Sequence, residues 1–430
     1  MPRSGAMGSR WLRQRAGVLA ETNFRRFYTG YVTSLFGSSM SAVAVAFAVL
    51  DSGKHATGLG YVFAAGVVPQ VLVLPVAGAV ADRFGRRRVM LAADTLRCAT
   101  QGALAGAVLA GRPALWVFVL LAWLGGTGEG FFTAARDALT VEIAPRGQLV
   151  NANAMYGLAR SATSIAGPAA GGVLVALAGS GVVVAVDAGS YAVSVLALAL
   201  IRLPRRAATR DGETDPGGPG LRRMLWRDMA EGWAEFRSRT WLWAVTVQFA
   251  FFNLITWAPW MLLGPVVAHA YLGGAAVWGV IMAAQGAGAI AAGLLALGRK
   301  PRRPMVVATV GTFCYALPDL PMALHAPAGW VAAAAFCCGA GSATSGTFYS
   351  TALQQQVPPE LIARVSSLTL FPAYGIGVIG YAIDGPLAAA FGPAAIFAVG
   401  AAYGLLSSAA VLTLRSVRRV TWADSRQDAP

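Results

Sequence analysis

Charge is scarce in this sequence, and so are the residue types on which most enzyme sites are built. Asp, Glu, Lys and Arg make up 12% of its 430 residues, whereas 56% are hydrophobic. Soluble domains carry about twice that share of charge, so the composition excludes an ordinary soluble protein. It indicates instead a chain that crosses a membrane many times.

Cysteine and histidine are rare, with four and three copies. All four cysteines fall inside apolar runs, and no pair of C-x-x-C motifs is present, which argues against disulfides and metal sites. The sequence also lacks H-E-x-x-H and G-x-S-x-G motifs and a nucleotide-binding loop. We therefore expect no metal, no cofactor and no enzymatic activity, and we do not expect ATP to be the direct energy source.

Acidic residues are fewer than basic ones, which gives a net charge of +15. The arginines lie in short clusters between apolar runs and not along one amphipathic face, so we do not expect nucleic-acid binding. With the N-terminus placed inside, every Lys and Arg except Lys54, Arg112 and Arg97 lies in a cytoplasmic segment or at an inner helix end. The positive-inside rule then predicts a multi-pass protein of the cell membrane with both termini in the cytoplasm.

Long apolar runs are what the sequence has in abundance. A helix needs about 20 mostly apolar residues to cross a bilayer, and twelve segments qualify. The predicted spans are 27–50, 58–80, 89–110, 114–134, 155–178, 181–202, 241–267, 275–298, 304–324, 328–350, 366–390 and 392–414. We therefore predict an all-α membrane protein.

One long polar stretch, residues 203–240, divides the spans into two sets of six. Its Pro- and Gly-rich part is typical of a linker, and apolar residues at helical spacing between arginines then predict an amphipathic helix on the inner leaflet. A helix that docks a partner is the alternative. The expected domains are 1–202, the linker 203–240, and 241–430.

The two halves resemble each other, which indicates an internal repeat. Shifting the first half by 213 residues places Pro145 on Pro358, and a shift of 215 places Gly78 on Gly293. We therefore expect two pseudo-symmetric six-helix bundles that work as a monomer.

A loop between the second and third spans carries the most specific motif. Residues 78–87 read G-x-x-x-D-R-x-G-R-R and resemble the signature loop of the major facilitator superfamily. That resemblance implies a loop that latches the two halves together on the inner side in the outward-open state. The residues concerned are Gly78, Asp82, Arg83, Gly85, Arg86 and Arg87. The repeat copy after Gly293 keeps basic charge but has lost the aspartate.

The fifth span contains G-P-x-x-G-G, which resembles the core of a motif associated with the antiporter branch of that superfamily. Its residues are Gly167, Pro168, Gly171 and Gly172, and Thr163 and Ala154 stand where the longer motif has further glycines. A proline within a helix removes a backbone hydrogen bond, and nearby glycines allow close helix packing. An ordinary kinked span is the alternative. Together, motifs across the first 205 residues resemble the macrolide-efflux and enterobactin-exporter-like branch.

Ionisable residues inside spans are costly and are candidates for function. Glu129 in the fourth span and Arg160 in the fifth lie at a similar expected depth, so an ion pair between them that opens on protonation of Glu129 could couple proton entry to substrate release. A static structural pair is the alternative. Asp384 is a second proton-site candidate. Asp94 and Arg97, three residues apart, are expected to pair structurally.

The seventh span is rich in aromatic residues and carries two amides. The expected substrate-cavity residues are Gln248, Phe252, Asn253 and Trp257. Such a lining suits a bulky lipophilic compound with a few hydrogen-bonding groups. Interfacial anchoring of some aromatic residues is the alternative.

The sequence therefore predicts a secondary transporter that works by alternating access, with protons and a small amphipathic molecule (a drug, an antibiotic or a siderophore-like compound) as its partners. Proton-coupled export is the leading hypothesis. Import of a nutrient by proton symport is the alternative. A membrane-embedded enzyme or a non-transporting sensor is the distant alternative.

Overall fold

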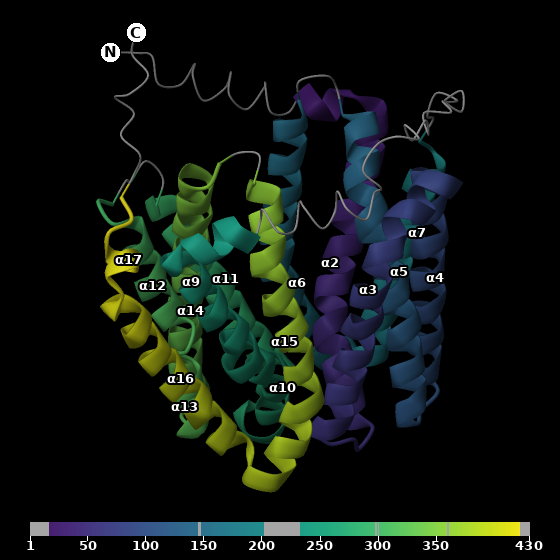
Figure 1. Ribbon diagram of the computed structural model, residues 1–430. Coiled ribbons are helices and arrows are strands. Elements are labelled where there is room, and N and C mark those ends of the chain that lie inside the picture. The colour runs from purple at the N-terminus through teal and green to yellow at the C-terminus, as the bar shows by residue number, and fades with distance from the viewer. Residues whose placement is uncertain are drawn as a thin grey trace, which may run out of the picture. The chain divides into compact units, whose positions relative to one another are not determined.

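The computed structural model of the chain describes residues 17–144, 148–201, 233–296, 299, 301–358 and 361–421. These residues are almost entirely helical, as predicted (Figure 1). Each of the twelve predicted spans corresponds to one long helix or to a consecutive set of shorter ones. Among the described residues, nine helical segments are long and apolar enough to cross a membrane, and α4, α14 and α15 are not counted among them.

The chain forms two compact units. Unit 1 comprises Met1–Pro204 and Ala268–Ala283, and unit 2 comprises Arg205–Val267 and Ala284–Pro430. Most of the linker, with its expected amphipathic helix, lies outside the described residues. Residues 233–238 at its end are helical, with Trp233 exposed and Phe236 buried.

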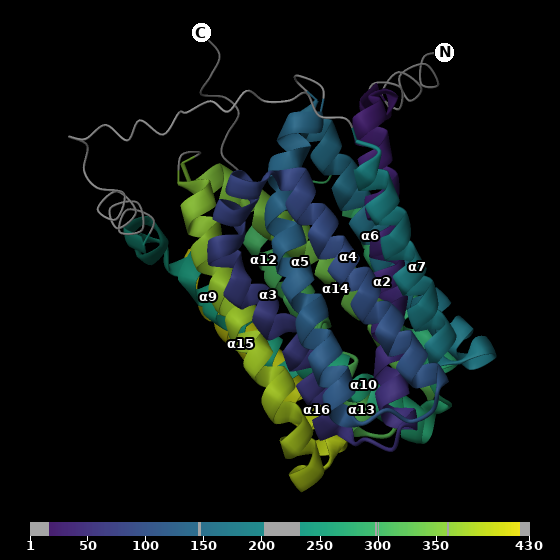
Figure 2. The same cartoon turned by 90° about the vertical axis from the view of Figure 1, so that its right-hand side faces the viewer.

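Unit 1 holds six long helices, the π-helix η3 and the start of α11. Their bounds are η1 Gly17–Ala20, α2 Thr22–Asp51, α3 Ala56–Phe84, α4 Arg86–Leu109, α5 Leu115–Ile143, α6 Leu149–Ala178, α7 Ser180–Ala199, η3 Ala268–Leu272 and α11 Ala275–Ala296. Helix α5 packs along α3 and α4, and α7 packs along α2 and α4 (Figure 2). One end of the unit has an aromatic core in which Tyr156 contacts the rings of Phe24, Phe27 and Tyr31.

Unit 2 holds the remaining spans, two of which are interrupted. Its elements are α9 Thr240–Phe252, η2 Asn253–Trp257, α10 Ala258–Val267, the rest of α11, α12 Pro304–Cys314, α13 Asp319–Ala323, α14 Ala328–Gln356, α15 Ile362–Phe391, α16 Pro393–Thr413 and α17 Arg415–Arg418. A π-helical turn, η2, lies between α9 and α10. The ninth predicted span breaks into α12 and α13 ahead of Asp319, where Pro318 and Pro321 interrupt the helical hydrogen bonds.

A single residue, Gly85, separates α3 from α4 and caps both helices. Its φ of +90° lies in the region that favours glycine, so the corner between the two helices requires this residue. The carbonyl of Gly85 accepts from the backbone N–H groups of Arg88 and Val89, at 3.0 and 3.1 Å. The signature loop is therefore a tight corner with no linker residues.

Candidate functional site: a buried charge network and a cavity

Arg97 is the centre of a charge network in the interior of unit 1. Its guanidinium pairs with Asp94 at 3.1 Å on the same helix, α4, as the i,i+3 spacing predicted. It also forms an ion pair with Glu129 on α5, and it donates to the hydroxyl of Tyr191 on α7 at 2.7 Å. One arginine thus joins three helices, because each of them contributes an acceptor at the same level.

Hydroxyl groups complete the hydrogen bonding of both carboxylates. Ser194 on α7 donates to Asp94 at 2.5 Å, and Thr133 donates to Glu129 at 3.0 Å. The hydroxyl groups of Tyr191 and Ser38 are 2.7 Å apart, which extends the network to α2. Buried ion pairs stay favourable only when their remaining hydrogen-bonding positions are also satisfied, and this network meets that condition at these atoms.

Close approach of α5 to α4 depends on Gly128. A Cβ there would lie 2.9 Å from Cγ of Arg97 and 3.0 Å from the carbonyl oxygen of Ala93. The glycine therefore makes room for the arginine beside Glu129, the next residue along the chain.

Exposure increases along the network from Asp94 to Glu129. The side chains of Asp94, Arg97 and Glu129 are 0%, 10% and 34% exposed. Glu129 also lies fourteen residues from either end of α5, about 21 Å from each at the helical rise. The network thus presents one partly accessible acid inside a predicted span, and ionisable residues inside spans are functional candidates.

The expected ion pair between Glu129 and Arg160 is not found, and this part of the prediction is corrected. Helix α5 packs along α3 and α4 and makes little contact with α6, which carries Arg160. The side chain of Arg160 is exposed, and Glu129 pairs with Arg97 instead. The prediction rested on the similar expected depth of the two residues. Depth does not determine which helices pack against each other, so it could not identify the partner of Glu129.

The signature loop fastens α4 to two other helices of unit 1. Arg86 pairs with Glu142 near the end of α5 at 2.8 Å. Arg87 donates to the carbonyl oxygens of Leu198 and Ala199, at 2.8 and 2.7 Å, and so caps the C-terminus of α7. Cations are favourable at that end of a helix because unpaired carbonyl groups give it negative potential.

The other loop candidates occupy the corner itself. Asp82 lies in the last turn of α3, and Arg83 follows it with an exposed side chain. Gly78 and Gly85 are exposed, and a Cβ at Gly78 would meet nothing within 4 Å. Gly85 is therefore required by its backbone conformation, whereas no close contact inside the structure requires Gly78.

The glycines of the fifth-span motif lie at helix contacts. Pro168 is inside the continuous helix α6. A Cβ at Gly167 would lie 2.3 Å from a serine side chain of α2, and one at Gly171 would lie 2.7 Å from a backbone oxygen of the same helix. A Cβ at Gly172 would lie 2.4 Å from the carbonyl oxygen of Ala275 in α11. The motif therefore allows backbone-to-backbone packing on two sides of α6.

Unit 2 contains a mostly apolar cavity of about 220 Å³. Its lining combines aromatic rings with hydroxyl groups and one amide, from Val245, Thr246, Gln248, Phe249, Met305, Ala308, Thr309, Thr312, Tyr315, Ser345, Gly346, Tyr349, Ser350 and Thr369. Pockets for drug-sized ligands occupy about 300–1,000 Å³, so this cavity fits one ring system of a larger compound.

Of the four predicted cavity residues, Gln248 lines this cavity, and the other three are not among its lining residues. The amide of Gln248 donates to Ser408 at 3.2 Å. Phe252 is buried, and its ring contacts that of Tyr315, a lining residue, at 4.9 Å between centroids. Asn253 and Trp257 are the first and last residues of the π-helix η2. Such π-helical turns occur frequently at functional sites.

Two buried acids of unit 2 have carboxyl oxygens that find no hydrogen-bond partner among the described residues. Asp384 on α15 is 3% exposed, and its Oδ2 is unpartnered. Asp319, at the start of α13, is 1% exposed, and both of its carboxyl oxygens are unpartnered. Sequence reasoning missed Asp319, although an acid between Pro318 and Pro321 inside an apolar run was a visible signal.

Comparison with protein families identifies the architecture. The sequence profile described as Major Facilitator Superfamily matches residues 27–380. Among solved structures, a POT family transporter in complex with 5-aminolevulinic acid superimposes with a TM-score of 0.68, at 11% identity over 91% of this chain and 95% of that one. A bacterial homologue of the iron transporter ferroportin gives 0.66, at 15% identity over 92% and 99% of the two chains.

Two relatives found by sequence comparison are named as efflux proteins. Macrolide efflux protein A of Streptococcus pyogenes is 25% identical over 353 residues, which cover 80% of this chain and 84% of the relative. Multidrug efflux pump Tap of Mycolicibacterium fortuitum is 28% identical over 391 residues, which cover 85% and 89% of the two chains. Both alignments extend well beyond the first half of the chain, where the sequence motifs are concentrated.

Proposed function

Because the chain belongs to the major facilitator superfamily of membrane transporters, we propose that it exports a small amphipathic compound in exchange for protons. One observation carries this proposal above all. A partly exposed carboxylate, that of Glu129, lies near the middle of its helix and pairs with a buried arginine that binds other acceptors as well. The efflux activity named for the two relatives supports the direction of transport.

The charge network offers a route for coupling. When Glu129 takes up a proton, its ion pair with Arg97 is lost, while Asp94 and Tyr191 continue to hold the arginine. The attraction between α5 and α4 is then weaker at mid-height, so proton uptake changes the relative stability of two helix arrangements. Exchange follows if substrate and proton favour opposite arrangements.

The cavity beside Gln248 supports the choice of substrate class. Phe249, Tyr315 and Tyr349 supply ring faces, and the hydroxyl groups and the amide supply a few directional contacts. Lipophilic compounds with several hydrogen-bonding groups match such a lining.

Orientation and assembly form part of the same proposal. In unit 1, Arg25, Arg26, Arg86 and Arg87 lie at the end formed by the start of α2 and the corner between α3 and α4. We assign this end to the cytoplasm by the positive-inside rule, which places both termini there in the cell membrane. We further propose that the protein works as a monomer and that the signature loop latches the inner side in the outward-open state.

Transport into sealed proteoliposomes tests the function. Flux of a radiolabelled macrolide and of a lipophilic cationic dye is measured with and without an imposed pH gradient. We expect accumulation that depends on the gradient and collapses with a protonophore. Accumulation that ignores the gradient contradicts proton exchange, and flux that runs in the same direction as protons supports symport instead.

A further inference from the structure

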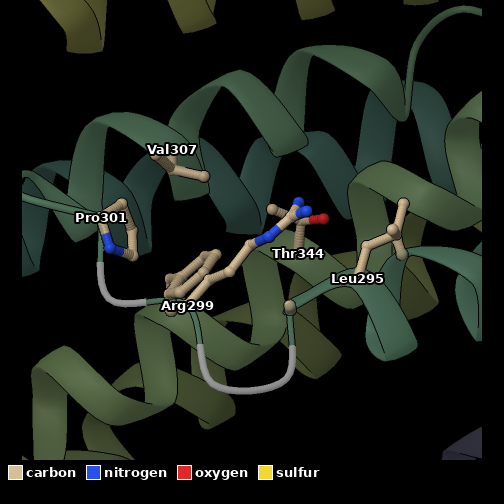
Figure 3. A pocket seen from close by; sticks show the side chains of 8 residues that line it. Leu295, Arg299, Pro301, Val307 and Thr344 are labelled. Carbon is tan, nitrogen blue, oxygen red and sulfur yellow. The ribbon is translucent and has the colours of Figure 1, made fainter.

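A second pocket, of about 530 Å³, lies at one end of unit 2 where α11, α12 and α14 meet. Most of its lining is apolar, and its one charged group is Arg299. The lining residues are Ala292, Leu295, Ala296, Arg299, Pro301, Val307, Thr344 and Phe348. Figure 3 shows the side chain of Arg299 extending in the direction of Thr344.

Arg299 has no ion-pair or hydrogen-bond partner for its side chain in the described part of the chain, and it is exposed. The corresponding loop of unit 1 differs, since Arg86 there pairs with Glu142. The shift of 213 residues that relates the fourth and tenth spans places the amide residue Gln355 at the counterpart of Glu142. The second repeat has thus kept the cation and lost the acid, which leaves an arginine available for an anion from outside the chain.

The pocket opens where the membrane interface is expected. Helix α11 ends at Ala296 and α12 begins at Pro304, so the loop between them joins two spans. Large apolar side chains beside it are exposed: Leu295 is 59% exposed, and Val310, one turn after Val307 on α12, is 49% exposed. In a protein that spans the membrane, such side chains contact acyl chains.

The hydroxyl of Thr344 donates to the carbonyl of Ala340 on its own helix, at 2.8 Å. Thr344 is a neutral lining residue of the pocket and leaves the charge of Arg299 unneutralised. The N–H groups of Arg299 are available, and a planar guanidinium binds phosphate oxygens through paired, charge-assisted hydrogen bonds.

We propose that this pocket binds one anionic phospholipid. The phosphate lies on Arg299, and an acyl chain follows the apolar wall from Leu295 toward Val307. Charge complementarity selects the anionic headgroup, while the exposed apolar side chains favour a lipid over a soluble anion. Basic pockets between spans bind anionic headgroups in this way.

Native mass spectrometry of the full-length protein in neutral detergent tests the proposal without any transport measurement. The probes are phosphatidylglycerol, phosphatidylcholine and inorganic phosphate. We expect one phosphatidylglycerol molecule to bind each chain in preference to phosphatidylcholine. Arg299→Gln weakens that binding about fivefold, the loss expected for one interfacial arginine. Arg302→Gln is the matched control, because Arg302 is an exposed cation of the same loop outside the pocket lining.

A second variant separates the pocket from the charge. Leu295→Trp fills the apolar wall, keeps Arg299, and is expected to weaken phosphatidylglycerol binding as well. Equal weakening by Arg299→Gln and Arg302→Gln shows diffuse attraction and overturns the site. Equal binding of the two lipids contradicts the preference for an anionic headgroup. Full displacement of phosphatidylglycerol by an equal concentration of inorganic phosphate contradicts the preference for a lipid over a soluble anion.

Discussion

The guanidinium of Arg97 reaches the carboxylate of Glu129 from the neighbouring helix, across Gly128, which has no side chain to separate them. Two other acceptors, Asp94 and Tyr191, hold the same guanidinium. The pair can therefore open at Glu129 without leaving the arginine isolated. Glu129 can therefore respond to protons, while Asp94 and Tyr191 keep Arg97 in place and hold the helices of unit 1 together.

Glu129→Gln is expected to remove coupling while leaving the fold intact. The amide oxygen still accepts from Thr133, but it neither attracts Arg97 as strongly nor binds a proton at ordinary pH. Flux driven by a pH gradient in proteoliposomes should fall to the level seen without a gradient, and exchange of substrate for substrate should persist. Gradient-driven flux at the original rate shows that Glu129 carries no coupling proton.

Arg97→Gln is expected to destabilise the protein by about 3–5 kcal/mol, because it leaves the buried Asp94 and the half-buried Glu129 without their cation. Thermal unfolding in detergent, followed by tryptophan fluorescence, measures the loss. Arg160→Gln is the matched control, since Arg160 is exposed, and its change should stay within about 0.5 kcal/mol. Equal losses in the two variants contradict the central position of Arg97.

Gly128→Ala should cost about 1–3 kcal/mol, since the new methyl group would crowd Arg97 and the backbone of α4. Gly125→Ala, on the same helix, meets only a hydroxyl oxygen at 3.6 Å and should be neutral or stabilising by about 0.5–1 kcal/mol. Unfolding temperatures of the two variants, compared side by side, measure the difference. The packing argument fails if they shift equally.

Asp319→Leu should raise stability by about 1–3 kcal/mol, because it removes a buried carboxyl group with no hydrogen-bond partner for either oxygen. Asp94→Leu should lower stability, since Asp94 is equally buried but pairs with Arg97 and accepts a hydrogen bond from Ser194. The unfolding temperature is measured on both. A destabilised Asp319→Leu protein shows that the carboxyl group has a stabilising partner.

Asp82→Asn is expected to abolish transport while membrane insertion and folding remain normal. Asp82 lies one turn from the corner that Gly85 forms, at the end of the unit assigned to the latch. Cell-surface abundance and flux are compared with the unchanged protein. Normal flux shows that the loop serves only as a topology signal.

The helical spans were predictable because hydrocarbon imposes a minimum apolar length, and the sequence displays it directly. The ends of the helices were less predictable. Helix α5 continues to Ile143, nine residues past the predicted end of its span, and α14 continues to Gln356 beyond 350. Hydropathy detects where a helix leaves the bilayer, whereas backbone hydrogen bonding continues through the polar turns that follow.

The sequence identified most of the ionisable residues of the site, but it did not predict the ion pair between Glu129 and Arg97. Glu129, Arg97 and Asp94 were each recognisable as ionisable residues inside spans, and the i,i+3 pair followed from helical geometry. The bond between Glu129 and Arg97 depends on which helices pack together, a tertiary property that one sequence does not contain. Asp319 was recognisable by the same rule and was overlooked.

The corner at Gly85 has a mechanical consequence. Since one residue caps both α3 and α4, no slack segment lies between them to absorb motion. A displacement at the end of α3 passes to α4, and through Arg86 and Arg87 it passes on to α5 and α7. At this end of unit 1, the helices α3, α4, α5 and α7 are therefore expected to move together as one rigid body.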